Sequence, residues 1–372
     1  MIPVNTPLLD GRELEYLEDC ISTGWVSSEG SYVTRFEEEV AEFSNRSHGV
    51  AVSSGTAALQ LAIEALQLPP GSEVIIPSFS IISCAACIVR VGLIPVPVDC
   101  SLQTFNVEAD KVERAITNRT SAIMVVHTYG LPVDLDPILQ LAEIHGLAII
   151  EDAAEAIGQS YKGRPCGSFG DASILSFYPN KHITTGEGGM VLTSSDQLAD
   201  RCRLLRNLAF EGKRRFVHYE LGWNFRMSNL QAAVGCAQLE NIDRNLKLKR
   251  QIGKLYNEHL RDLNRIMLPK PGFGSELNVY WVFTIVLEAN IDATAEDVMR
   301  RLREKGIGTR PMFWPIHRQP VFLEMYPEFE GMSLPNSEFL AEKGLYLPSG
   351  LGLDLAIIPE ICEKVRDVIE EF

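Results

Sequence analysis

The chain has 372 residues, of which 46% are hydrophobic and 22% are charged, and its formal net charge is -15 at pH 7. This length exceeds what one hydrophobic core usually supports, so we expect two lobes. The acidic residues are spread along the chain. That distribution argues against a nucleic-acid-binding protein, because binding to a duplex needs a broad basic face.

The N-terminal segment lacks the basic and apolar regions of a secretory leader, and no apolar run approaches the length of a membrane span. We therefore expect a cytoplasmic protein without a membrane partner. The 8 cysteines are too sparse for a disulfide framework, so we expect reduced thiols. Cys84 and Cys87 have the spacing of a metal site, but no second Cys pair or His pair accompanies them. We expect them to fill the core and predict no metal site.

Short apolar runs alternate with helical patterns through the first two thirds of the chain. After Ser31, apolar side chains recur at Val33, Phe36, Val40 and Phe43, which is the spacing of an amphipathic helix. Apolar runs bounded by turn residues predict buried strands at 49–52, 73–76, 122–126, 147–150, 172–176 and 190–193. This alternation predicts an α/β domain with a mostly parallel sheet.

The last third of the chain has a different pattern. A long helical pattern runs from about Asn229 towards Leu260, and a Pro- and Gly-rich stretch at 268–274 then indicates a hinge. Beyond the hinge, the sequence predicts a strand at 279–287 and helices at 295–305 and 357–372. We therefore predict a large domain of residues 1–240 and a smaller C-terminal α+β domain of residues 241–372.

Lys181 and Asp152 are the candidate catalytic residues. Lys181 lies in a Gly- and Thr-rich turn between two apolar runs, and Asp152 follows a predicted strand, where ligands of open α/β sheets collect. A lysine amine can form a Schiff base with the aldehyde of pyridoxal phosphate, and an aspartate can keep the pyridine nitrogen protonated. Taken singly, an exposed lysine and an N-cap aspartate remain open alternatives. Together the two residues predict a pyridoxal phosphate enzyme.

Residues 53–59 suggest where a phosphate would bind. This segment contains Gly55 and Thr56, follows a predicted strand and opens an apolar helix, so its free N–H groups and helix dipole favour an anion. On its own, an ordinary N-cap explains the segment better, because capping sequences are common. Glu155 is expected on the same helical face as Asp152, where it would reach the cofactor ring or complete a capping box.

Four segments together resemble a known family. They are residues 53–59, EDAAEAIG at 151–158, SFYPNKHITTGEGGM at 176–190 and GWNFRMSNLQAAVG at 222–235. In order and spacing they resemble the sugar-nucleotide aminotransferases of the DegT/DnrJ/EryC1/StrS family, and the resemblance covers nearly the whole chain. It implies the type I fold of pyridoxal phosphate-dependent aminotransferases, with a mostly parallel seven-stranded sheet in the large domain.

The resemblance implies a role for each residue around the cofactor ring. Lys181 would carry the Schiff base, and Asp152 would pair with the pyridine nitrogen. Glu155, where many relatives have glutamine, would lie near the ring hydroxyl. Relatives usually have an aromatic residue where Ile81 stands, so stacking on the ring is in question here.

The resemblance also implies a phosphate site that needs two subunits. Gly55, Thr56 and Ser176 would bind the phosphate, and Asn224 would reach it from a partner subunit. A homodimer with shared active sites is therefore expected. Dehydratases of this fold replace the lysine itself with histidine, whereas here His182 follows an intact Lys181, which favours transamination.

Residues for the sugar nucleotide are implied less directly. Lys213, Arg214 and Arg215 form the densest basic cluster and are candidates for the diphosphate, with a solvated basic loop as the alternative. His317 would lie near the hexose unless it is a structural histidine. Trp25 belongs to segment 24–30, which, with segments 10–13 and 211–215, most resembles the GDP-perosamine synthases of the family, and it is assigned to the substrate on that basis.

These resemblances imply a reaction. The enzyme would take an amino group from L-glutamate, hold it as pyridoxamine phosphate, and deliver it to the C4 ketone of a 4-keto-6-deoxy sugar nucleotide. GDP-4-keto-6-deoxymannose is the leading acceptor, while UDP- or dTDP-linked sugars, a dehydratase of the same fold and a non-enzymatic regulator stay open. A nicotinamide dehydrogenase is disfavoured, because no strand-linked GxGxxG is present.

Overall fold

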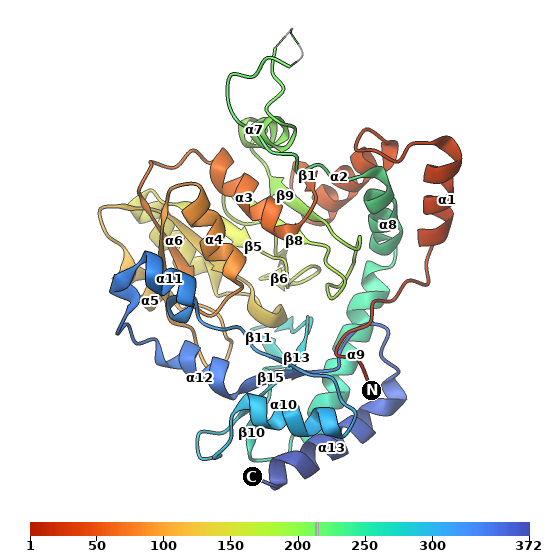
Figure 1. The fold of residues 1–372 in the computed structure, drawn as a ribbon, viewed down its shortest axis with the longest axis vertical. Coiled ribbons are helices and arrows are strands. Elements are labelled where there is room, and N and C mark those ends of the chain that lie inside the picture. Colours follow the sequence, from red (N-terminus) through yellow and green to blue (C-terminus); the bar gives the residue numbers. More distant parts are fainter. Residues whose placement is uncertain (213, 215) are drawn as a thin grey trace.

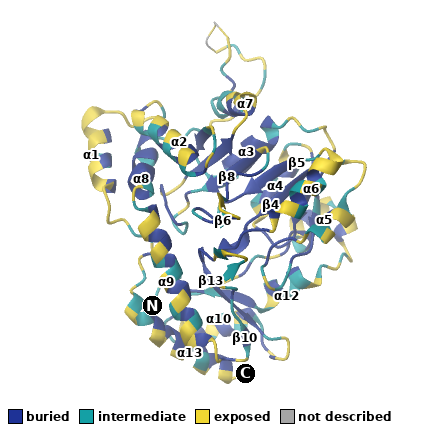
Figure 2. Ribbon diagram, turned by 180° about the vertical axis from the view of Figure 1, so that it is seen from behind, coloured by how far each residue is buried: buried dark blue, intermediate teal, exposed yellow. Residues whose placement is uncertain are grey.

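The computed structural model of the protein describes residues 1–212, 214 and 216–372. Within these residues, a seven-stranded sheet lies in the N-terminal part of the chain and a four-stranded sheet in the C-terminal part (Figure 1). Most residues of both sheets are buried, and the exposed residues lie mainly on the outer faces of helices and in loops (Figure 2). The predicted α/β class with a second, smaller α+β lobe is confirmed.

The large sheet is mostly parallel. Its strands, in spatial order, are β1 His48–Val52, β9 Gly189–Thr193, β8 Ala172–Ser176, β5 Ala148–Asp152, β4 Thr120–Val126, β2 Glu73–Pro77 and β3 Ile94–Val98. Strand β9 is antiparallel to both of its neighbours, whereas the other paired strands are parallel. Parallel strands covered on both faces read as continuous apolar runs, which is why the sequence predicted them well.

Strand β3 is the one strand of this sheet that the sequence analysis missed. Its sequence is Ile-Pro-Val-Pro-Val, and Pro95 and Pro97 cannot donate to a hydrogen-bond ladder. The strand lies at the edge of the sheet and pairs only with β2, so it needs only one set of ladder bonds. Proline is tolerated at such an edge.

Helices cover both faces of the large sheet. One face carries α3 Gly55–Ala65, α4 Ile82–Arg90 and α7 Asp196–Arg206. The other face carries α5 Ala109–Ala115 and α6 Leu135–His145, and beside them α1 Glu13–Thr23, α2 Ser31–Phe43 and α8 Asn229–Leu239. The arrangement is a three-layer sandwich whose apolar side chains pack above and below the strands.

The C-terminal part starts with α9 Ile242–Leu260. The small sheet follows the order β10 Ile266–Met267, β13 Phe283–Leu287, β15 Gly344–Leu347 and β14 Arg310–Pro311. Its helices are α10 Ala295–Glu304, α11 Pro320–Met325, α12 Pro335–Lys343 and α13 Ile358–Glu370. Two short hairpins complete the fold: β6 Ser160–Tyr161 with β7 Arg164–Pro165, and β11 Gly272–Phe273 with β12 Glu276–Leu277.

Two predicted elements differ from the structure. The long helical pattern after Asn229 is two helices, because the chain turns at Glu240 and Asn241, where Asn241 has φ -104° and ψ 7°. The strand expected at 279–287 begins only at Phe283, since Tyr280 has a φ of 46° that no strand accommodates. The domain boundary at residue 240 stays a prediction.

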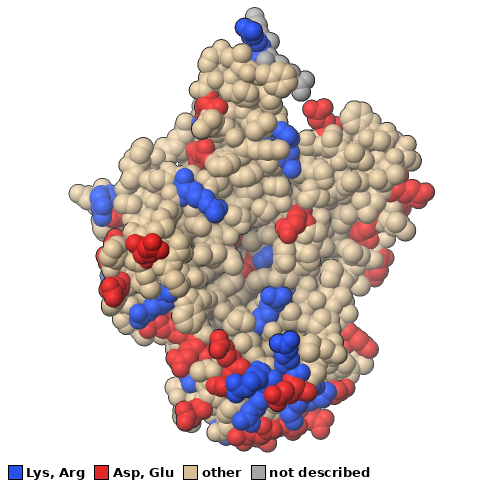
Figure 3. Space-filling view, viewed as in Figure 1, with Lys and Arg blue, Asp and Glu red and all other residues tan. Residues whose placement is uncertain are grey.

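Surface features agree with the composition. No helix in the described part of the chain is long and apolar enough to span a bilayer. On the face shown in Figure 3, charged side chains of both signs gather over α10 and α13, at the C-terminal end of the molecule. All eight cysteines are free and buried. Cys84 and Cys87 lie in α4 and pack in the core, as expected.

Candidate active site

A cavity of about 370 Å³ lies where the carboxyl ends of β5 and β8 meet the start of α3 and the C-terminal part of the chain. The face seen in Figure 3 is hollowed near its centre, and charged atoms are visible inside that hollow. Seven of the residues predicted for the cofactor line this cavity: Gly55, Thr56, Ile81, Asp152, Glu155, Ser176 and Lys181. Residues far apart in sequence therefore form one site.

Lys181 lies in the turn after β8, and its side chain is 9% exposed. Its Nζ lies 3.9 Å from Oε1 of Glu155 and 3.7 Å from the centroid of the Trp281 ring. Burial lowers the pKa of this amine, and the nearby carboxylates of Glu155 and Asp152 oppose that effect. When the pKa of a buried lysine is lowered, a larger fraction of its amine is neutral, and the neutral amine is the form that acts as a nucleophile.

Asp152 is the last residue of β5, and its carboxyl is buried. Oδ1 accepts a hydrogen bond from the N–H of Ala154 at 3.0 Å, and Oδ2 accepts a weak one from the thiol of Cys84 at 3.5 Å. No ion pair of Asp152 is found within the described residues. Burial raises the pKa of this carboxyl, so a cationic partner in the cavity would be strongly favoured.

Glu155 reaches the cavity by a different route from the one predicted. Residues 153–158 form turns and no helix follows Asp152, so the N-cap and capping-box alternatives are wrong. Oε2 of Glu155 accepts the backbone N–H of Tyr129 at 2.9 Å, which leaves Oε1 facing Lys181. Burial raises the pKa of Glu155 to about 7, although Lys181 and the Tyr129 N–H both act to lower it.

The start of α3 combines both alternatives considered for it. Ser54 is an N-cap, because its side chain accepts the Ala57 N–H at 3.1 Å. Among the described residues, the N–H groups of Gly55 and Thr56 have no protein acceptor. A Cβ on Gly55 would lie 2.8 Å from Cβ of Ser176, so glycine is needed for this close approach. Backbone donors and a serine hydroxyl thus lie close together in the cavity, an arrangement that suits an anion.

These residues fit pyridoxal phosphate. Unpaired N–H groups at the start of α3 suit its phosphate, and the buried carboxyl of Asp152 suits its pyridine nitrogen. The Lys181 amine lies in the same cavity for its aldehyde. Ile81 lines the cavity and is 42% exposed, in a position where an apolar face can cover the ring.

The sequence analysis missed the aromatic wall of the cavity. Trp281, Phe313 and Tyr346 come from the C-terminal part of the chain, and Tyr178 precedes Lys181. The indole N–H of Trp281 donates to the carbonyl of Asn180 at 2.9 Å, which holds the ring beside the lysine. The cluster Tyr280-Trp281 offered a signal, but it was interpreted as part of a strand.

Asn224, Trp25 and Arg214 do not line this cavity. Asn224 is exposed and forms an isolated bridge with Asn207. Trp25 is 56% exposed, and Arg214 is exposed. Lys213 and Arg215 lie outside the described residues. The roles assigned to these five residues stay predictions.

His182 and His317 are buried, and the residues that their ring nitrogens contact do not line the cavity. Nδ1 of His317 is 2.7 Å from the Ser78 hydroxyl, and its Nε2 is 2.9 Å from Oε1 of Glu338. This geometry is that of the structural alternative considered for His317, and its role at the hexose stays a prediction. His182 turns away from Lys181 and contacts the carbonyl of Val279 at 3.1 Å.

Comparisons with known proteins show which family the chain resembles. Residues 7–366 match the model of the DegT/DnrJ/EryC1/StrS aminotransferase family. GDP-perosamine synthases of Vibrio cholerae and Caulobacter vibrioides are each 40% identical to the chain, which they cover to 99%, with 99% and 98% of their own lengths matched. The structure of S. venezuelae DesV in complex with a ketimine intermediate is 33% identical and has a TM-score of 0.89, covering 96% of this chain and 94% of its own.

The fold, the family match and the cavity lead to one conclusion. The fold is that of the pyridoxal phosphate-dependent sugar aminotransferases, as the sequence predicted. The predicted lysine, aspartate and phosphate-binding segment line one cavity within it. The chain belongs to the DegT/DnrJ/EryC1/StrS aminotransferase family.

Proposed function

We propose that the protein transfers the amino group of L-glutamate to the C4 ketone of a GDP-linked 4-keto-6-deoxyhexose, with pyridoxal phosphate as cofactor. The products are 2-oxoglutarate and a GDP-linked 4-amino sugar. The observation that carries this proposal is the buried Lys181 amine, which shares one cavity with the carboxyls of Asp152 and Glu155. The GDP-linked acceptor is supported by the names of the relatives at 40% identity.

Asp152 and Lys181 have distinct roles in this reaction. When bound, pyridoxal phosphate supplies an electron sink that stabilises negative charge on the reacting carbon of the substrate. The carboxylate of Asp152 holds a proton at the pyridine nitrogen, because an anion buried in this position favours the cationic form. The Lys181 amine removes and returns the proton at the reacting carbon, and its lowered pKa suits a general base.

Glu155 supports the proton transfers of Lys181. Its Oε1 lies 3.9 Å from Nζ, and burial raises its pKa to about 7. Because its pKa is raised towards neutrality, this carboxyl can exchange a proton with the amine or with a nearby hydroxyl at little cost. The aromatic wall of Trp281, Phe313 and Tyr346 limits the access of water to these groups.

The proposal includes a homodimer. Within the described residues, the start of α3 and the Ser176 hydroxyl face the cavity as donors for the phosphate, whereas Asn224 is exposed on the surface of the same chain and does not line it. A second copy that brings its Asn224 to the phosphate would complete the site. Exposed apolar side chains near Asn224, which include Tyr219, Leu221 and Trp223, support a contact between copies.

The test is an assay of purified protein with glutamate and a panel of 4-keto-6-deoxy sugars linked to GDP, UDP or dTDP, with products read by mass. We expect the amino product only with the GDP-linked sugar. Amination of a UDP- or dTDP-linked sugar alone would overturn the acceptor. Loss of a hydroxyl with release of ammonia would indicate a dehydratase, and absence of any turnover with intact cofactor binding would support a regulator.

Lys181→Ala and Lys181→Arg test the lysine itself. Both variants should lack the visible absorption of the bond between lysine and cofactor, and both should lose turnover. Arginine keeps the positive charge in the cavity but has no amine that can react, so it separates charge from chemistry. If either variant kept the absorption band, another lysine would hold the cofactor.

A further inference from the structure

One turn forms hydrogen bonds with both acidic residues of the site. It consists of His127 and the 3-10 helix η1 Thr128–Gly130, and it follows β4 directly. We call residues 127–130 the acid-binding turn. The backbone N–H of His127 donates to the carbonyl of Asp152 at 3.1 Å, and the backbone N–H of Tyr129 donates to Oε2 of Glu155 at 2.9 Å.

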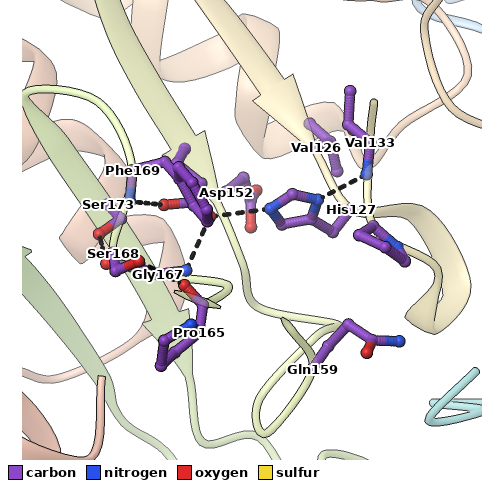
Figure 4. A network of polar contacts seen from close by, with 12 residues as sticks. Val126, His127, Val133, Asp152, Gln159, Pro165, Gly167, Ser168, Phe169 and Ser173 are labelled. Carbon is purple, nitrogen blue, oxygen red and sulfur yellow. Dashed lines mark hydrogen bonds and ion pairs between the residues drawn. The ribbon is translucent and has the colours of Figure 1, made fainter. Parts of the chain in front are cut away.

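The His127 side chain fixes the turn to β5 through Glu151. Figure 4 shows the His127 ring, with Val133 bonded to its other side. Nδ1 of His127 accepts the N–H of Val133 at 3.0 Å, so the proton of the neutral ring is on Nε2, which donates to Glu151 at 2.8 Å. Glu151 also accepts the N–H groups of Gly167 and Phe169. His127, Glu151 and Cys166 lie close enough together to hold a metal ion. However, the ring nitrogens of His127 and the carboxylate oxygens of Glu151 are already hydrogen-bonded within the protein, so these residues support the fold.

Tyr129 has a backbone conformation that requires an explanation. It is buried, yet its φ is 56° and its ψ is 22°, a left-handed conformation that L-residues rarely adopt. Such conformations persist only where surrounding contacts enforce them, and they are concentrated at functional sites. In this conformation the N–H of Tyr129 points at the carboxylate of Glu155.

Contacts of the Tyr129 side chain supply that enforcement. Its ring is stacked on Phe313, with centroids 5.0 Å apart, and on Trp281, with centroids 5.6 Å apart. Its hydroxyl accepts the backbone N–H of Phe313 at 3.1 Å. Trp281 in turn covers the Lys181 amine, so the same aromatic group contacts both the lysine and the residue that holds its acidic neighbour.

We propose that Tyr129 is a positioning residue for the reaction: held in a left-handed conformation by Trp281 and Phe313, it aims its backbone N–H at Glu155 and so fixes the second carboxylate oxygen towards Lys181. The role in transamination rests on the proposed function. The placement of the Glu155 carboxyl by the Tyr129 N–H does not depend on that function, because it involves only one backbone group and one side chain.

The state of Glu155 reports on this contact. The charged or titratable groups around it are Lys181, which favours its carboxylate, and Asp152, Tyr346 and the phenol of Tyr129, whose ionised forms disfavour it. The N–H of Tyr129 favours the carboxylate. Losing that N–H bond should therefore raise the pKa of Glu155, by about 1 pH unit or more for a hydrogen bond to a charged group.

Tyr129→Gly and Tyr129→Val form a matched pair that isolates the backbone. Both remove the ring and the hydroxyl, but glycine adopts a positive φ readily and keeps the N–H in place, whereas valine strongly disfavours it. Protein without cofactor is labelled with [5-¹³C]glutamate, and the Glu155 resonance is assigned by its loss in Glu155→Gln. We expect a Glu155 midpoint about 1 pH unit higher in Tyr129→Val than in Tyr129→Gly.

Phe105 supplies the control pair. It is buried with a φ of 65°, and its ring packs edge-on to Tyr129 at 6.1 Å, but it makes no hydrogen bond to Glu155. Phe105→Val should lose stability relative to Phe105→Gly without moving the Glu155 midpoint. Equal midpoints in the two Tyr129 variants, or an equal shift in the Phe105 pair, would overturn the proposal.

A replacement variant and the use of cofactor-free protein make the result of the titration unambiguous. If Tyr129→Val does not fold, Tyr129→Ala takes its place, because alanine disfavours positive φ with less strain. The titration uses protein without cofactor or substrate, so its result is independent of the transamination assay. Failure of that assay with a normal Tyr129 result would reject the proposed function alone.

Discussion

Lys249→Met would test how a buried lysine sets the pH dependence of stability. Lys249 lies in α9 and is 2% exposed. Its Nζ donates to the carbonyls of Trp281, at 2.8 Å, and Ser349. A neutral amine has two N–H groups for these two acceptors, so it is satisfied without its charge. Burial lowers the pKa of Lys249 from 10.5 to about 7.

The sign and size of the effect follow from linkage. Between pH 7 and 10.5 the unfolded chain carries the lysine proton and the folded protein does not, so wild-type stability rises with pH across this window. Each pH unit of the window contributes about 1.36 kcal/mol, which gives about 5 kcal/mol over the whole window. Methionine cannot titrate, so Lys249→Met lacks this contribution to the slope.

Urea denaturation of both proteins at several pH values measures the effect. The difference in unfolding free energy, wild type minus variant, should increase by about 1.4 kcal/mol per pH unit between about pH 7.5 and 9.5. Other titrating groups cancel in this difference. Lys254→Met is the control, since Lys254 lies on the same helix with 75% of its side chain exposed, and should give no slope. Parallel profiles for wild type and Lys249→Met would refute the reasoning.

Three other changes probe the site. Glu155→Gln removes an anion 3.9 Å from Lys181 Nζ, so the pKa of the amine should fall by about 1 or more. The pH of half-maximal cofactor capture by the cofactor-free protein then moves down, and an upward move contradicts this. Ile81→Phe should slow cofactor dissociation about threefold, followed by dilution; an unchanged rate argues against stacking. Gly55→Ala brings Cβ to 2.8 Å from Ser176, and calorimetry should show at least about tenfold weaker cofactor binding.

The sequence by itself determined every strand of the large sheet except β3, and it identified the residues that can react with a cofactor. Central strands such as β4 and β5 are apolar throughout because both of their faces are covered, and this pattern survives in any single sequence. Asp152 and Lys181 were identifiable from their neighbours in the sequence. Asp152 ends an apolar run that predicts a strand, and Lys181 lies in a Gly- and Thr-rich turn between two apolar runs. Local pattern was sufficient for these features.

Other features were not decided by local sequence. Strand β3 contains Pro95 and Pro97, and only its edge position makes it a strand. Asp152 and Glu155 looked like the start of a helix, but the acid-binding turn takes up the Glu155 carboxylate, and residues 153–158 form turns. In both cases a partner distant in sequence decides the hydrogen bonds. Strand β2 pairs with β3, and the Tyr129 N–H binds the Glu155 carboxylate.

Tertiary structure alone decided the protonation state of the Lys181 amine. Trp281 is 100 positions from Lys181 in sequence, and Tyr129 is 52 positions away, yet the first covers the amine and the second holds its acidic neighbour. The lowered pKa of Lys181 and the raised pKa of Glu155 both come from burial between the two parts of the chain. Composition names the groups that can react, but the dielectric around them exists only once distant segments have excluded water.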